Sequence, residues 1–164
     1  MIHNICVDDE NISRYYKGIY ARNELCFIEL EQPALYIVNT AHAFESYGHW
    51  IVIFVTDDGV IEYFDSLGKR LYSRHKNFKN FILSKNKTYR ESMVRIQSQT
   101  SSTCGLFCLY YCYFRVRKFS LSYILNHFSK SCYCKNENHV RIFCTYVMNV
   151  VIDKSVSFDY KQNK

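Results

Sequence analysis

The sequence has very little proline and glycine, with one Pro and five Gly among 164 residues. Linkers and low-complexity tails are rich in these residues, so their scarcity excludes several domains joined by long flexible connections. The chain also lacks the uninterrupted run of about 18 apolar residues that a membrane-spanning helix needs. Its longest aromatic-rich run, residues 106–114, is far shorter. We therefore expect a single domain over residues 1–164 that has no membrane partner.

A secretory signal and a dense basic tract are also missing. Residues 1–10 have neither the basic flank nor the apolar segment of a signal peptide. Without a signal, eight cysteines indicate a reducing compartment, with most of them serving as free thiols in the core. Lys and Arg exceed Asp and Glu by 21 to 15, but they are scattered. We expect an intracellular protein whose charge of +6 permits DNA binding without requiring it.

Apolar residues make up 48% of the chain, and their pattern is clearest in a β-hairpin. Residues 50–55 form the strongest strand signal, residues 56–59 are a turn, and residues 60–64 return as a second strand. His49 stands just before the first strand and Asp65 just after the second. Because the outer ends of a hairpin meet, His49 and Asp65 are predicted to be neighbours in space.

A buried helix is the second strong signal, since residues 104–117 are almost continuously apolar. The fold class is therefore predicted to be α+β, with a mixed β-sheet packed against this central helix. The weaker predictions are helices at 12–18, 69–83, 121–128 and 139–151, strands at 35–38 and 93–96, and a fraying polar segment from Asp153.

Cys104 opens the buried helix after a loop of small polar residues, 98–103. The unpaired N–H groups and the positive dipole end of a helix start stabilise a thiolate. A thiolate that attacks a carbonyl also needs a base, a group that orients the base, and donors for the oxyanion. His49 is the candidate base and Asp65 the candidate orienting acid. These residues predict a cysteine protease.

The oxyanion hole is assigned to Gln97 and the backbone N–H of Cys104, which follow one another across the loop. The substrate cleft is assigned to Gly48, Trp50 and Gly105, since Gly105 leaves room for a substrate backbone beside the thiolate.

Each of these residues taken alone has a structural explanation. A buried Cys at a helix start usually serves packing, and a lone His before a strand is more often structural. The ordered set of His49, Asp65, Gln97 and Cys104 favours catalysis. His42 is the alternative base, although no strong strand follows it.

A zinc site is the competing use of the remaining cysteines. Its ligands would come from Cys132 and Cys134 together with His127, His139 and Cys144. The C-x-C spacing is tighter than the usual C-x₂-C, and no second paired motif exists. No metal is therefore expected, and the role of Cys132 and Cys134 stays open.

Several of these segments resemble adenain, the maturation protease of adenoviruses, and its relatives in adintoviruses and Maverick/Polinton elements. The matching segments are residues 15–20, 37–41, 48–50, 63–68 and 101–108, with Gln97 seven residues before Cys104. SUMO-specific proteases form a wider group with the same His, Asp, Gln, Cys order. The resemblance covers roughly residues 12 to 115. It implies a papain-like core in permuted chain order and the roles given above for His49, Asp65, Gln97 and Cys104.

The resemblance also implies partners and a location. Adenain-like enzymes cleave capsid and core precursor proteins in the host nucleus or virion, and they use DNA and a viral peptide as activators. In adenain the peptide is joined by a disulfide to a cysteine upstream of the nucleophile. No cysteine lies between Cys26 and Cys104, so covalent activation is not expected here. The chemistry itself requires no cofactor, and a monomer is expected.

Three functions remain open at this point. The first is an endopeptidase that processes viral or element-encoded precursors. The second is an isopeptidase for SUMO or ubiquitin with the same triad, which needs a binding surface for a folded modifier. The third is a non-catalytic nucleic-acid-binding or zinc-stabilised interaction protein, which would not need His49, Asp65 or Gln97.

Overall fold

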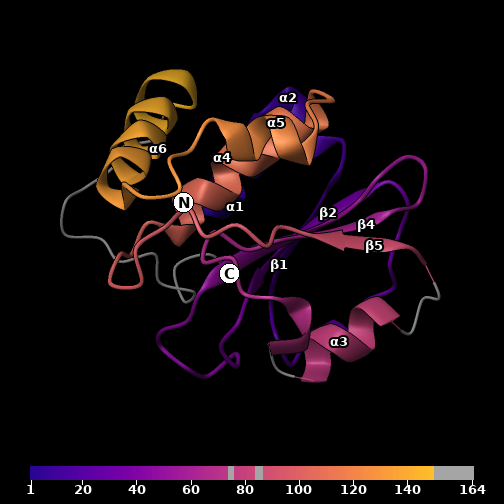
Figure 1. Cartoon of the computed structure of the whole chain (residues 1–164). Coiled ribbons are helices and arrows are strands. Elements are labelled where there is room, and N and C mark those ends of the chain that lie inside the picture. The colour runs from indigo at the N-terminus through magenta and orange to yellow at the C-terminus, as the bar shows by residue number, and fades with distance from the viewer. Residues whose placement is uncertain (74–75, 84–86, 150–164) are drawn as a thin grey trace.

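A mixed five-stranded sheet lies at the centre of the computed structural model, which describes residues 1–73, 76–83 and 87–149 (Figure 1). The strand order follows the chain, from β1 at one edge to β5 at the other. The strands are β1 (Tyr16–Ala21), β2 (Ala34–Asn39), β3 (Trp50–Val55), β4 (Ile61–Phe64) and β5 (Tyr89–Glu91). The outer pairs, β1–β2 and β4–β5, are parallel. The inner pairs, β2–β3 and β3–β4, are antiparallel.

The predicted hairpin is confirmed as β3 and β4. Val55 pairs with Ile61 beside the turn, and Val52 pairs with Phe64 towards the outer end. Gly59 has a φ of 81° in the turn, a conformation that glycine adopts without steric cost. All residues of both strands are buried, because helices cover both faces of the sheet.

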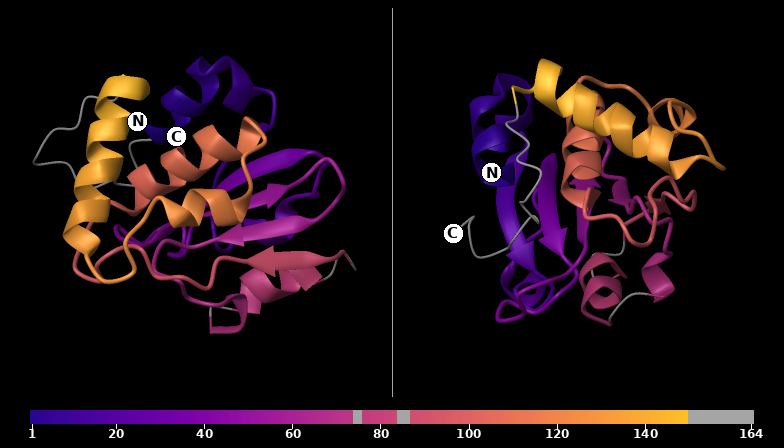
Figure 2. Two further views of the ribbon diagram at one scale, coloured as in Figure 1. Left: turned by 45° about the horizontal axis from the view of Figure 1, so that its top comes forward. Right: turned by 90° about the vertical axis from the view of Figure 1, so that its left-hand side faces the viewer.

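Two layers of helices enclose the sheet (Figure 2). One face is covered by α1 (Ile2–Asp8), α2 (Glu10–Ser13), α4 (Cys104–Val116), α5 (Leu121–Asn126) and α6 (Tyr133–Val147). The other face packs against α3 (Lys76–Leu83) and the short 3₁₀ turns η1 (Leu25–Phe27) and η2 (Leu71–Ser73). The period-two alternation of strand side chains divides the core. Leu35 and Ile37 face the α4 layer, whereas Tyr36 and Val38 face α3.

The predicted central helix is confirmed as α4. Its residues are buried from Cys104 to Cys112, so this helix is apolar on all sides rather than amphipathic. The ring of Tyr111 stacks on Phe64 of β4, with ring centroids 4.5 Å apart. The α+β class predicted from the sequence is therefore the observed one.

The predicted helix at 12–18 is wrong. The structure places α2 at Glu10–Ser13, and β1 begins at Tyr16. The segment after Ser13 is rich in tyrosine, which favours strands, and it gains a parallel ladder with β2. Gly18 has a φ of 136°, which a helix does not allow, and the register shifts between Tyr16 and Gly18.

The predicted strand at 93–96 is also wrong, because β5 lies earlier, at Tyr89–Glu91. The later segment follows the backbone of Ser66, whose carbonyl accepts hydrogen bonds from the N–H groups of Ile96 and Gln97 at 2.9 and 3.1 Å. A loop, rather than a sheet strand, thus leads to Gln97.

The other helix predictions are confirmed in kind, with different bounds. The segment 69–83 contains η2 and α3, and its apolar residues Leu71, Phe78, Phe81 and Ile82 are buried. The last helix begins at Tyr133, six residues before the predicted start at His139. Its predicted end at Val151 and the polar segment from Asp153 lie outside the described residues. Among the helices of the described ranges, none is long and apolar enough to cross a membrane.

Candidate active site

His49 and Asp65 meet at the outer end of the β3–β4 hairpin. The Nε2 atom of His49 lies 2.7 Å from Oδ1 of Asp65. The backbone of His49 is held in place by two hydrogen bonds with Thr40, one through its carbonyl at 2.8 Å and one through its N–H at 3.0 Å. The predicted proximity of the two residues is therefore confirmed.

The carboxylate of Asp65 is fully buried and fixed in orientation. Its Oδ1 atom accepts a second hydrogen bond from the backbone N–H of Leu67 at 2.8 Å. The hydroxyl of Tyr63 donates to Oδ2 at 3.4 Å, and Ser92 Oγ accepts from the backbone N–H of Asp65 at 2.9 Å. These contacts aim the carboxylate at the imidazole of His49.

The imidazole of His49 is suited to carry a proton near neutral pH. Burial by itself lowers its pKa, but the hydrogen bonds with Asp65 and Cys104, together with the negative charges of both groups, raise the pKa to about 8. Because Nε2 is used by Asp65, Nδ1 is the nitrogen available to Cys104. The side chain is 13% exposed, so it still reaches the surface of the cleft.

Cys104 is the first residue of α4, and it is 7% exposed. The side chain of Thr103, at the N-cap, does not cap the helix, because its hydroxyl pairs with Ser101 Oγ at 2.7 Å. The first N–H groups of a helix have no partner within the helix. The N–H groups of Cys104 and Gly105 consequently point out of the helix start, where they can bind a negatively charged oxygen.

Gln97 is buried, and its side chain is fixed at both ends. Its Oε1 accepts a hydrogen bond from Ser66 Oγ at 2.6 Å, and its Nε2 donates to the carbonyl of Ser101 at 2.9 Å. An amide nitrogen carries two hydrogens, so the second one remains for a ligand.

A cleft of about 280 Å³ joins His49 and Cys104, whereas Gln97 and Asp65 are not among its lining residues. Its walls are formed by Ser46, Tyr47, Gly48, His49, Trp50, Leu67, Gln99, Ser101, Ser102 and Cys104. Gly48 is exposed, whereas the Trp50 side chain is only 1% exposed. Gly105 is buried in the first turn of α4 and does not line the cleft.

Sequence reasoning gave no separate role to Ser66 and Ser101, which fix the two ends of the Gln97 amide. It also did not assign Tyr47 and Leu67 to the cleft. Ser66 follows Asp65 directly, and a hydroxyl beside the candidate orienting acid is a usable signal. Ser101 acts through its backbone carbonyl, for which no residue type is diagnostic.

None of the alternative candidates, His42, His127 and His139, lines this cleft. The ring of His42 packs on Phe44, with centroids 4.0 Å apart. His127 and His139 both bind the hydroxyl of Tyr110, at 2.6 and 3.1 Å. Among the described residues, no group of three or more His, Cys, Asp or Glu side chains is arranged to hold a metal ion.

Comparison with known proteins gives limited similarity. No family model matches the chain, and no curated protein matches its sequence. The solved structures that match include the ASFV pS273R protease, with a TM-score of 0.45 and 21% identity over 74% of this chain. This chain spans about half of that protein, since the match covers 47% of its length.

Proposed function

We propose that this protein is a cysteine endopeptidase in which Cys104 is the nucleophile, His49 the base and Asp65 the residue that orients the base. The observation that carries the proposal is the 2.7 Å hydrogen bond between His49 and buried Asp65, which leaves Nδ1 of His49 for the thiol that opens α4. A buried carboxylate that holds an imidazole beside a thiol is the arrangement that nucleophilic catalysis requires.

The reaction follows from the positions of these atoms. The thiolate of Cys104 attacks the substrate carbonyl carbon, and the C–N bond breaks as protonated His49 gives its Nδ1 proton to the leaving amine. A thioester on Cys104 remains. Water then attacks the thioester while Nδ1 takes one of its protons, and the acid product leaves as the thiolate is restored. Asp65 stays ionised and holds Nε2–H throughout.

The negative oxygen of each tetrahedral intermediate is assigned to two donors, the Gln97 side-chain amide and the backbone N–H of Cys104. Both donors are fixed before substrate arrives, one by Ser66 and Ser101 and the other by the helix. Donors that need no reorganisation during the reaction lower the barrier the most.

The resemblance of several segments to adenain suggests the substrates, the location and the activator of the enzyme. The substrates would be capsid or core precursor proteins of a virus or mobile element, processed in the host nucleus or virion by a monomeric enzyme. The small cleft beside Tyr47 and Leu67 favours small residues, such as glycine, around the cut. The net charge of +6 is compatible with DNA as an activator.

The decisive experiment compares wild type with Cys104→Ala on Gly-Gly-type peptides and precursor proteins, with and without DNA. Cleavage lost in Cys104→Ala and stimulated by DNA is the expected result. Cleavage that persists in Cys104→Ala would overturn the mechanism. Cleavage by wild type of SUMO or ubiquitin conjugates alone would replace the endopeptidase with an isopeptidase.

A further inference from the structure

Two cysteines outside the proposed catalytic machinery lie side by side at the start of α6. The Sγ atoms of Cys132 and Cys134 are 3.6 Å apart. Cys134 is exposed and Cys132 is partly exposed, in contrast to the buried thiols of the core. One residue, Tyr133, separates them in the sequence. Two accessible thiols in van der Waals contact form a dithiol that soluble reagents can reach.

The pKa values of the two thiols are shifted in opposite directions. The backbone N–H of Lys135 and the neighbouring Cys134 thiol both lower the pKa of Cys132. The hydrogen bond with Cys132 and its negative charge raise the pKa of Cys134. The pair therefore ionises first at Cys132, with a thiol beside it. A more acidic attacking thiol next to a second, resolving thiol is the arrangement that thiol–disulfide exchange uses.

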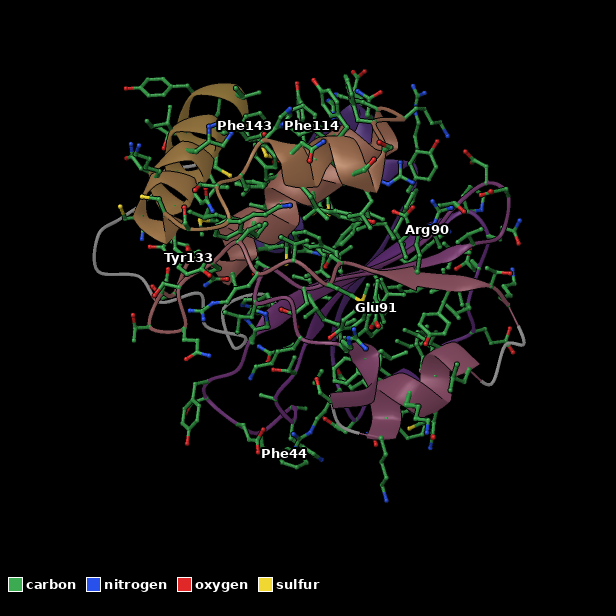
Figure 3. All side chains as sticks on the ribbon, viewed as in Figure 1. Phe44, Arg90, Glu91, Phe114, Tyr133 and Phe143 are labelled. Atoms are coloured by element: carbon green, nitrogen blue, oxygen red, sulfur yellow. The ribbon has the colours of Figure 1, made fainter. Side chains whose placement is uncertain are left out.

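The dithiol is connected to the proposed oxyanion hole through the residue between the cysteines. The guanidinium carbon of Arg95 lies 4.6 Å from the ring centroid of Tyr133. The Nε atom of Arg95 donates to the backbone carbonyl of Gln97 at 3.0 Å. Figure 3 labels Tyr133, at the end of α6 that faces the loop before α4. Arg95 therefore bridges the Tyr133 ring and the backbone of Gln97.

The next residues of α6 hold the neighbours of Gln97. Asn136 is buried, and its Nδ2 donates to the carbonyl of Ile96 at 2.8 Å. Glu137 accepts the backbone N–H of Ser98 through Oε1 at 3.1 Å. The first turns of α6 therefore bind the segment 95–98 at three points, on both sides of Gln97.

We propose that Cys132 and Cys134 form a redox-active dithiol, oxidised by a low-molecular-weight disulfide such as oxidised glutathione, whose closure loosens the segment 95–98. The Cys132 thiolate attacks one sulfur of the disulfide reagent, whose S–S bond breaks and releases one thiolate. The Cys134 thiol loses its proton to solvent, and the resulting thiolate attacks the Cys132 sulfur and releases the second thiolate. Both released thiolates take protons from solvent. The two cysteines lose two electrons and two protons, and the reagent is reduced to two thiols.

Closure has to disturb Tyr133. The sulfur atoms must approach from 3.6 Å to about 2.05 Å. Cys132 is the N-cap residue, with φ −122° and ψ 83°, and Cys134 lies in the first turn of α6. Bringing their sulfur atoms together therefore pulls on the backbone on both sides of Tyr133. Tyr133 then changes its backbone conformation and its contact with Arg95. The segment that carries Gln97 is then held less firmly. An effect of this change on catalysis rests on the proposed function, whereas formation of the disulfide does not.

The chemistry is tested in the Cys104→Ala chain by incubation with oxidised glutathione, followed by peptide mass mapping. The expected product is a peptide that contains Cys132 and Cys134, lacks two hydrogens and carries no glutathione. Cys132→Ser and Cys134→Ser should each keep glutathione on the remaining cysteine. Exposed Cys26 is the matched single thiol and should form only a mixed disulfide. Glutathione on both Cys132 and Cys134, or no reaction at either, would overturn the proposal.

The coupling is tested by amide hydrogen exchange of residues 95–98 in the reduced and oxidised protein. We expect exchange about tenfold faster after oxidation, the effect of losing one net hydrogen bond, and no change in the Cys132→Ser/Cys134→Ser double variant. Equal rates in both states would refute the coupling. Cleavage is measured separately in wild type. A chain that shows both effects but cleaves nothing would contradict the proposed function and leave the dithiol standing.

Discussion

Arg115 of α4 binds Glu62 of β4 at two points, with Nε 2.7 Å from Oε2 and Nη2 2.9 Å from Oε1. The Glu62 side chain is 1% exposed, and that of Arg115 is 11% exposed. The hydroxyl of Tyr111 donates to the same carboxylate at 2.7 Å. This ion pair joins the helix that Cys104 opens to the strand that directly precedes Asp65.

Arg115→Met should destabilise the protein by about 3 kcal/mol, the low end for breaking a buried pair. The buried Glu62 carboxylate loses its bidentate partner and keeps only the half-exposed Arg90, whose Nε lies 3.5 Å from Oε1. The matched control is Lys17→Met, which breaks the exposed pair of Lys17 with Glu31 and should cost less than about 1 kcal/mol. Urea unfolding of the two variants measures both effects. Equal losses would show that the buried pair does not anchor α4.

The ionisation of His49 should make stability depend on pH. Its pKa rises from 6.5 to about 8 on folding, so the folded state binds the proton more tightly than the unfolded state. The resulting stabilisation, about 2 kcal/mol, is fully present below about pH 6.5 and is lost as the pH rises through about 8. The free energy of unfolding, measured across this range, should fall.

Asp65→Asn is the control for this pH dependence, because it removes the negative charge that raises the pKa of His49. The decrease in stability between the two pH limits should shrink in the variant. An unchanged slope would mean that another group is responsible.

Gln97→Glu should lower kcat by about 10²–10³-fold with a small change in KM, because an oxyanion donor acts mainly in the transition state. Gln99→Glu makes the same chemical change at an exposed residue that lines the cleft, and kcat should stay near the wild-type value. Steady-state peptide kinetics distinguish the two variants. Similar losses in both would indicate that added negative charge, rather than a lost donor, slows the reaction.

Gly48→Ala should destabilise the loop before β3. A Cβ atom at this position would lie 1.9 Å from Oδ1 of Asn39 and 2.6 Å from Cβ of Ala41. Asn39 is buried, and its Oδ1 accepts the backbone N–H of Ala41 at 2.8 Å. Relief of this overlap should cost about 1–3 kcal/mol in unfolding free energy.

Tyr47→Ala is the matched control for Gly48→Ala, because Tyr47 is the preceding residue and is 86% exposed. Its stability should stay within about 0.5 kcal/mol of wild type. If the two variants unfold at the same denaturant concentration, the close approach of Gly48 to Asn39 does not constrain the loop.

The parts of the site that could be predicted from the sequence depend on local patterns. Residues 50–64 form a hairpin by strand propensity and turn chemistry alone, and a hairpin brings His49 to Asp65 without knowledge of any other segment. The α4 helix follows from one continuous apolar run that begins at Cys104. The positions of these three residues were therefore accessible before the structure.

The missed features depend on contacts between distant segments. Tyr16 enters a strand because β2 offers it a parallel partner, and Ile96 stays outside the sheet because the Ser66 carbonyl takes its N–H. Asn136 supports Ile96 across 40 residues of sequence. No local period or composition encodes such pairings, so the support of Gln97 could be read only from the fold.

The burial of the core cysteines has a consequence for covalent labelling. Burial raises the pKa of Cys108 and Cys112 far above the ordinary value, and it raises that of Cys144 to about 12. These thiols stay protonated and enclosed, so an electrophile added to the folded protein does not react with them. With the accessible thiols Cys26, Cys132 and Cys134 replaced by serine, a chloroacetamide or vinyl sulfone would modify Cys104 alone. Because the core cysteines do not react, the covalent labelling of this variant by an inhibitor reports modification of Cys104 only.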